Sequence, residues 1–95
     1  MIEVRIITTE GCEGCRIMKN IANKAVNQLT SDSNLDIKVT NFDCLDEAIR
    51  QFANRYQVKD YPATFIIKDN KVVDRIFGTC TKQTMINTLV TKYIG

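Results

Sequence analysis

The feature that most constrains this chain is a cysteine pair, Cys12 and Cys15, that lies between two different hydrophobic patterns. The segment before the pair, residues 4–9, is rich in β-branched residues and predicts a buried strand. The segment after it places apolar residues at helical spacing between Ile17 and Leu29. The two cysteines are therefore expected at the point where a strand ends and a helix begins.

This position favours thiol chemistry, because the N–H groups at a helix N-terminus are unpaired and carry partial positive charge. A cysteine there ionises more easily, and the thiolate is the form that attacks disulfides. The C-x-x-C spacing lets the second thiol attack the mixed disulfide formed on the first. We therefore expect Cys12 to be the nucleophile and Cys15 the resolving thiol. Neighbouring charges act in both directions, since Arg16 favours the thiolate whereas Glu10 and Glu13 oppose it.

The remaining patterns predict an α/β fold. In chain order they indicate a strand at 35–39 that ends near Phe42, a short helix capped by Asp46, a strand at 63–67, an Asp69-Asn70 turn, a strand at 71–77, and a last helix capped by Thr81. The order β-α-β, then α, then β-β-α predicts a four-stranded mixed sheet with helices on both faces. No repeat, linker or low-complexity tract interrupts it, so residues 1–95 are expected to form a single domain.

Composition excludes several classes of function. A net charge of +2, without any basic run interleaved with aromatic residues, does not favour binding to nucleic acid. No stretch is long and apolar enough to span a bilayer, and the first residues lack the pattern of a signal peptide. We therefore expect a cytoplasmic protein. Four cysteines are kept reduced in that compartment, so a close pair indicates redox or metal chemistry before a structural disulfide.

Taken together, these features resemble the thioredoxins: a strand leading into C-x-x-C at a helix start, followed by a strand, a helix, a hairpin that begins at a proline, and a terminal helix. Residues 58–72, which include Tyr61 and Pro62, are similar to the family's second signature. Gly78 falls where thioredoxins carry a glycine at the end of the hairpin. The resemblance covers almost the whole chain but lacks an extra N-terminal strand and helix, so the protein looks like a minimal redox protein of thioredoxin or glutaredoxin size.

The resemblance implies a thiol–disulfide oxidoreductase, an enzyme and electron carrier without a cofactor, that acts on protein disulfides as a monomer. A reductase or a low-molecular-weight thiol would regenerate it. It also implies a cis peptide bond between Tyr61 and Pro62, opposite the cysteine pair. The backbone of Tyr61 would then pair with a substrate strand, and Gly78 would allow close approach of that strand.

The sequence departs from the thioredoxin pattern at three points: residues 11–15 differ from the usual W-C-G-P-C, Tyr61 is bulkier than the usual residue before the cis-proline, and the buried acid is missing. Ile6 stands where thioredoxins place a buried aspartate that handles the proton of the resolving thiol. This leaves three interpretations open: Glu10 or Glu13 takes over that role, water does, or resolution is slower.

Two other functions remain possible on sequence grounds. Cys44 and Cys80 could complete a zinc site with the cysteine pair, although their separation in the chain is unusual for such a site. The fold could also serve as a binding module without catalysis. Taken singly, Cys44 and Cys80 are best interpreted as small, partly buried residues, with a regulatory disulfide between them or a glutathione contact at residues 78–81 as further alternatives.

Overall fold

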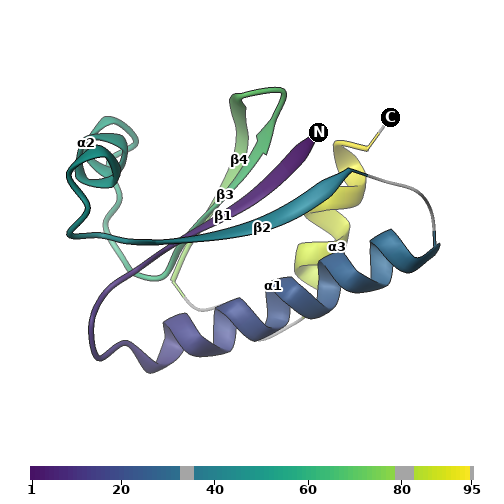
Figure 1. The fold of residues 1–95 in the computed structure, drawn as a ribbon, viewed down its shortest axis with the longest axis horizontal. Helices are drawn as coiled ribbons and strands as arrows, with labels where there is room; N and C mark the ends of the chain where they lie inside the picture. The colour runs from purple at the N-terminus through teal and green to yellow at the C-terminus, as the bar shows by residue number, and fades with distance from the viewer. Residues whose placement is uncertain (33–35, 79–82, 95) are drawn as a thin grey trace.

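The computed structural model describes residues 1–32, 36–78 and 83–94 (Figure 1). Its elements are β1 (Ile2–Thr8), α1 (Glu13–Asp32), β2 (Ile37–Asp43), α2 (Glu47–Arg55), β3 (Ala63–Lys68), β4 (Lys71–Phe77) and α3 (Gln83–Lys92). The strands form one sheet in the order β2-β1-β3-β4. Strand β1 pairs with β2 in parallel and with β3 antiparallel, and β3 pairs with β4 antiparallel. The predicted four-stranded mixed sheet is confirmed.

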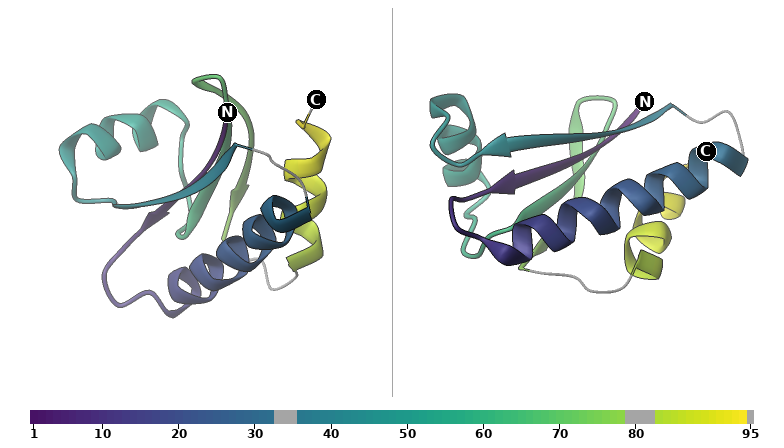
Figure 2. Two further views of the ribbon diagram at one scale, coloured as in Figure 1. Left: turned by 45° about the vertical axis from the view of Figure 1, so that its right-hand side comes forward. Right: turned by 60° about the horizontal axis from the view of Figure 1, so that its bottom comes forward.

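Helices cover both faces of this sheet, as predicted. Helices α1 and α3 pack against one another on one face, and α2 lies on the other (Figures 1 and 2). Alternate residues of each strand point to opposite faces, so one strand supplies both layers. Val4 and Ile6 of β1 join the aliphatic cluster under α1 and α3, whereas Ile7 joins an aromatic cluster under α2. Among the described residues, no helix combines the length and apolar character needed to cross a bilayer.

The turns and caps follow the sequence closely. The side chain of Asp46 accepts a hydrogen bond from the N–H of Ile49 at 3.3 Å, which confirms Asp46 as the cap of α2. Asp69 and Asn70 both adopt positive φ angles, of 51° and 68°, in the tight turn between β3 and β4. Mirror-image turns of this kind match the right-handed twist of a hairpin. The proposed cap at Thr81 lies outside the described residues.

Strand β2 ends at Asp43, next to the predicted end at Phe42, and Phe42 is opposite Ile7 in the parallel register. Phe42 broke the alternation because it faces α2, whereas Ile37 and Val39 face α1. Both sides of β2 are covered, so a period based on one face misses the other.

Not every residue on the apolar side of the helices is buried, although helical spacing predicts that these Ile, Leu and Met residues face the core. Ile17 is 39% exposed and Met85 is 49% exposed. Each precedes a fully buried residue, Met18 and Ile86 respectively. One helical position turns a side chain by about 100°, so only the second residue of each pair faces the sheet.

Candidate active site

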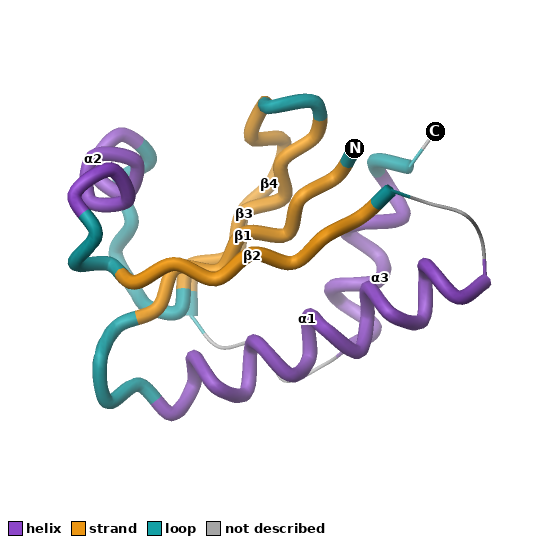
Figure 3. Tube along the Cα trace, viewed as in Figure 1, coloured by secondary structure: helices purple, strands orange, loops and turns teal. Residues whose placement is uncertain are grey.

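Cys12 lies on the loop that joins β1 to α1, and Cys15 lies in α1 itself. This loop is at one end of the sheet (Figure 3). Gly11 adopts a φ of +69°, which glycine tolerates and which turns the chain from the strand into the helix. Cys12 immediately precedes Glu13, the first residue of α1, and Cys15 lies in the first turn. The predicted placement at a strand-to-helix junction is confirmed.

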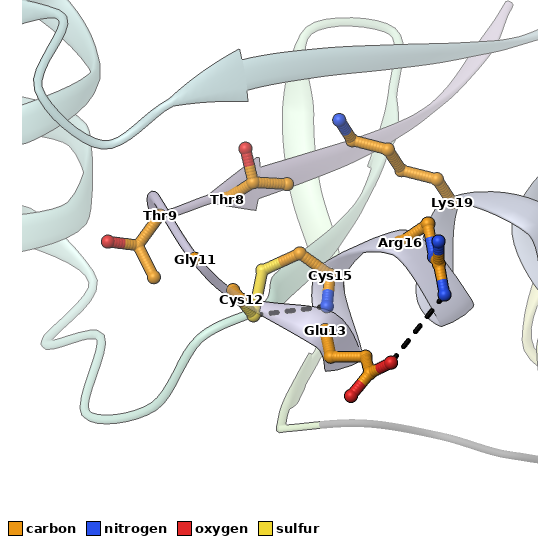
Figure 4. Close-up of a pocket in the computed structure, with 8 residues that line it drawn as sticks. All are labelled: Thr8, Thr9, Gly11, Cys12, Glu13, Cys15, Arg16 and Lys19. Atoms are coloured by element: carbon orange, nitrogen blue, oxygen red, sulfur yellow. Dashed lines mark hydrogen bonds and ion pairs between the residues drawn. A yellow bond between two sulfur atoms is a disulfide. The ribbon is translucent and has the colours of Figure 1, made fainter.

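Cys12 and Cys15 form a disulfide whose Cα atoms are 5.3 Å apart (Figure 4). The two halves of the bond differ in exposure, because Cys12 is half-buried whereas Cys15 is only 3% exposed. The backbone N–H of Cys15 donates a hydrogen bond to Sγ of Cys12 at 3.0 Å. This donor is one of the N–H groups that a helix start leaves without a backbone partner. It is aimed at the sulfur that solvent can reach.

The charged residues predicted to tune the site are near the pair but lie in solvent. The guanidinium of Arg16 contacts the Glu13 carboxylate at 3.6 Å, and both side chains are more than three-quarters exposed. Glu10 is also exposed, in the turn before Gly11. Water screens charges at such positions strongly, so their influence on the cysteine pair is small.

A hollow of about 610 Å³ opens beside the disulfide. It is lined by the end of β1, the connecting loop and the first two turns of α1: Thr8, Thr9, Gly11, Cys12, Glu13, Cys15, Arg16 and Lys19 (Figure 4). The hydroxyl of Thr8 donates a hydrogen bond to the carbonyl of Phe42 at 3.3 Å, which ties the end of β1 to β2. Solvent can therefore approach the disulfide on the α1 side of the sheet.

Tyr61, Pro62 and Gly78 lie together at the end of the sheet where β1 also ends. The predicted cis peptide bond between Tyr61 and Pro62 is present. Because Ala63 pairs with Ile7 in the antiparallel register, Pro62 is next to the end of β1. Gly78, with a φ of +91°, donates its N–H to the carbonyl of Pro62 at 2.9 Å. Within the described residues, the backbone N–H and carbonyl of Tyr61 make no hydrogen bond.

Cys44 lies close to Tyr61, on the side of the edge that faces α2. Burial raises the pKa of the Tyr61 phenol, and the nearby Cys44 adds a smaller contribution in the same direction. Both residues line a hollow of about 460 Å³ together with Leu45, which is 72% exposed. The Cys44 thiol is free and half-buried. Cys80 lies outside the described residues, and no cluster of metal-ligating side chains is found within them.

Sequence reasoning missed the hollow beside the disulfide and the part that Lys19 plays in it. Lys19 lies four residues after Cys15, so the two share one side of α1. That spacing was visible in the sequence. The position of Thr8 against the helix was not, because it depends on how α1 crosses the sheet.

Known proteins show the same fold. The family model described as Thioredoxin matches residues 6–91. A thioredoxin pre-protein from Schistosoma mansoni has a TM-score of 0.73 at 15% identity, over 98% of this chain and 79% of that one. Mitochondrial thioredoxin 3 from Saccharomyces cerevisiae has a TM-score of 0.71 at 18% identity, over 96% of this chain and 77% of that one.

At 27% identity, a thioredoxin from Fasciola hepatica matches 98% of this chain and 81% of its own, with a TM-score of 0.67. No curated protein sequence matches. The family model covers nearly the whole sheet, the cysteine pair and both helices of the α1 face. This chain belongs to the thioredoxin family.

Proposed function

We propose that the protein is a thiol–disulfide oxidoreductase that carries electrons to protein disulfides. The observation that carries this proposal is the disulfide at the start of α1, with one sulfur accessible and the other covered. A structural disulfide has no need of that asymmetry. A redox pair does, because one thiol must meet the substrate while the other waits beneath it.

In the proposed reaction, the reduced Cys12 attacks a substrate disulfide as a thiolate. The N–H of Cys15, 3.0 Å from the Cys12 sulfur, is placed to stabilise that negative charge. A mixed disulfide forms and one substrate thiolate leaves with a proton from solvent. Cys15 then attacks the Cys12 sulfur, which releases the second substrate thiol and closes the Cys12–Cys15 bond.

The substrate backbone docks against Tyr61. Its N–H and carbonyl are unpaired within the described residues. On either side the backbone is hydrogen-bonded, since the N–H of Val58 donates to Ala53 and the carbonyl of Pro62 accepts from Gly78. An extended peptide can therefore pair with the backbone of Tyr61, beyond the start of β3, in the manner of strand addition. Gly78 has no side chain to obstruct it, and open space surrounds the position where a Cβ would stand.

The cycle requires an outside source of electrons. A reductase, or a low-molecular-weight thiol, returns the Cys12–Cys15 disulfide to the dithiol after each turnover. We place this cycle in the cytoplasm, where such donors keep thiols reduced, with the protein acting as a monomer.

The test is reduction of insulin disulfides with dithiothreitol as the electron donor. The wild-type protein should accelerate the reaction, and Cys12→Ser should lower the rate to that of dithiothreitol alone, because the attacking thiol is lost. Cys15→Ser should instead accumulate a covalent complex with the substrate, visible on a non-reducing gel. Cys44→Ser is the matched control and should retain wild-type turnover.

A Cys12→Ser protein that reduces insulin at the wild-type rate would falsify the proposal. A wild-type protein whose cysteine pair never cycles in glutathione buffers, while still binding partners, would favour a binding module instead. Stoichiometric zinc binding that protects the thiols of the reduced protein would favour a metal site.

A further inference from the structure

Thr64 carries a buried hydroxyl without a partner. Its side chain is completely buried, and Oγ1 has no hydrogen-bond partner within the described residues. Buried hydroxyl groups are nearly always paired, and an unpaired one destabilises the fold. Such an atom in a native protein calls for an explanation, and one possible explanation is a role in the thiol chemistry.

The sheet register places Thr64 under the start of α1. Thr64 pairs with Ile6 in the antiparallel ladder, so both side chains point to the face that α1 covers. Two residues further along β1 on the same face is Thr8, which lines the hollow together with Cys15. Helix α1 begins at this end of the sheet and runs away from it (Figures 1 and 3). The Thr64 hydroxyl is thus in the row of side chains beneath the first turn that holds Cys15.

Cys15 needs a polar neighbour in the reduced protein. Its side chain is 3% exposed, and the buried residues that surround the helix on this face are aliphatic. A thiol in such surroundings resists ionisation, because the thiolate loses its hydration. Yet Cys15 attacks as a thiolate when it resolves the mixed disulfide.

We infer that the Thr64 hydroxyl donates a hydrogen bond to the Cys15 thiolate during resolution; this inference rests on the proposed function. In the disulfide form the Cys15 sulfur carries no negative charge, and the Thr64 hydroxyl makes no hydrogen bond within the described residues; opening the Cys12–Cys15 bond supplies the charge that the hydroxyl would stabilise. In the mixed disulfide, the Cys15 thiol gives its proton to solvent through the hollow beside Thr8. The thiolate then attacks Cys12, the bond between Cys12 and the substrate sulfur breaks, and the substrate thiolate takes a proton from solvent. The pair loses two electrons and the substrate disulfide gains them.

Other charged groups near Cys15 do not supply this contact. On α1, Glu13, Arg16 and Lys19 line the hollow, with the first two mostly in solvent. Glu10 is exposed in the preceding turn. The buried residues that β1, β3 and α3 contribute to this face do not titrate.

At the opposite end of the same face, Tyr93 donates a hydrogen bond to Asp74, beside the start of β1. Glu3 and Arg5 belong to the other face of the sheet, where they contact one another and the aromatic residues under α2. The described titratable groups therefore supply no buried donor on the Cys15 side, whereas the Thr64 hydroxyl is buried and unpaired on that face of the sheet.

The experiment separates attack from resolution. Reduced protein carrying Cys44→Ser and Cys80→Ser is mixed with an equimolar aromatic disulfide that releases a coloured thiolate. Attack by Cys12 releases the first coloured thiolate, and resolution by Cys15 releases the second. Thr64→Val removes the hydroxyl at nearly constant shape, whereas Thr64→Ser keeps it.

Thr64→Val should slow the second phase about tenfold and leave the first unchanged, because only the resolving thiolate loses its donor. The pH midpoint of the second phase should move upward by about one unit, since a less stabilised thiolate needs a higher pH to form. Thr64→Ser should restore both within about twofold. The melting temperature of Thr64→Val should not fall, which excludes a damaged fold.

A Thr64→Val protein with the wild-type second phase and midpoint overturns the inference while leaving the proposed function intact. Equal slowing by Thr64→Ser and Thr64→Val also overturns it, because the effect then follows packing and not the hydroxyl. If the protein that retains Thr64 does not release the first coloured thiolate, the result counts against the proposed function itself.

Discussion

The two faces of the sheet bury their residues in different ways. Under α2 the core is aromatic: Phe65 packs against Phe52 with ring centroids 4.8 Å apart, and against Phe77 at 6.1 Å. The buried carboxylate on that face is paired, since Glu3 accepts hydrogen bonds from Arg5 and Thr40. Under α1 and α3 the core is aliphatic, and it contains the unpaired hydroxyl of Thr64.

The groups that accept hydrogen bonds at the helix starts also differ between the two faces. Helix α2 begins on the carboxylate of Asp46, which accepts from the N–H of Ile49. Helix α1 begins on a sulfur, because Cys12 accepts from the N–H of Cys15. A carboxylate cap stabilises a helix, whereas a sulfur at the same position can change its redox state. Under the proposed function, the α2 face serves stability alone, whereas the α1 face also holds the groups that carry out the chemistry.

Among the variants that test this difference between the two faces, Phe65→Ala should change the free energy of unfolding most. Phe65 is completely buried and contacts three other aromatic rings on the α2 face. Its truncation should lower the free energy of unfolding by about 4 kcal/mol, measured by urea denaturation. Rates of insulin reduction, measured below the melting temperature, should fall less than in a variant of the α1 face, because the cysteine pair lies across the sheet even though Tyr61 packs against the same aromatic cluster.

Ile66→Ala is the matched control, since Ile66 is the next residue of β3, equally buried, and faces α1. It should cost about 3 kcal/mol and also disturb the helix that holds the cysteine pair. If Phe65→Ala changed the reduction rate as much as Ile66→Ala, the functional division between the two faces would be wrong.

Sequence alone reached most of this architecture because local signals agree with the fold. The strand before Cys12, the amphipathic helix after it and the turn at Asp69 each depend on neighbouring residues only. The sequence could not predict that Phe42 faces α2, because a strand covered on both sides loses its alternation. The unpaired hydroxyl of Thr64 was equally invisible, since it follows from a register between strands nearly sixty positions apart in the chain.

The next largest effect concerns the ion pair of the α2 face. Burial alone would raise the pKa of Glu3, but hydrogen bonds from Arg5 and Thr40, with the charges of Arg5 and Lys38, hold it below its ordinary value. A lowered pKa means that this contribution to stability is present above the ordinary value of 4.5 and is lost as the pH falls through the folded-state pKa. The guanidinium also stacks over the Phe52 ring at 5.0 Å.

Arg5→Met should therefore cost about 2 kcal/mol at neutral pH, because it leaves the Glu3 carboxylate buried with fewer partners. The pKa of Glu3 then rises, because the hydrogen bond and the charge of Arg5 are both lost. The variant should therefore lose less stability than the wild type as the pH falls through the folded-state pKa of Glu3. Thermal unfolding between about pH 3 and 7 measures both effects. Lys38 pairs with Glu3 in the parallel register, but its charge makes the smallest contribution to the lowered pKa. Lys38→Met should therefore change the pH dependence less than Arg5→Met, and an equal change would contradict the assignment to Arg5.

The smallest effect comes from the helix start that has no redox role. Asp46→Ala removes the carboxylate that caps α2 and should lower the free energy of unfolding by about 1 kcal/mol, measured by urea denaturation. Asp46→Asn keeps a capping oxygen and should cost little. Neither change should alter the rate at which Cys12 attacks a disulfide, since α2 and the cysteine pair lie on opposite faces.

By contrast, reduction of the Cys12–Cys15 bond alters the sulfur on which α1 begins, so the stability of the fold should depend on redox state through α1 and not through α2. An Asp46→Ala protein whose oxidised and reduced forms differ in stability by a different amount from wild type would show that the two helix starts are coupled.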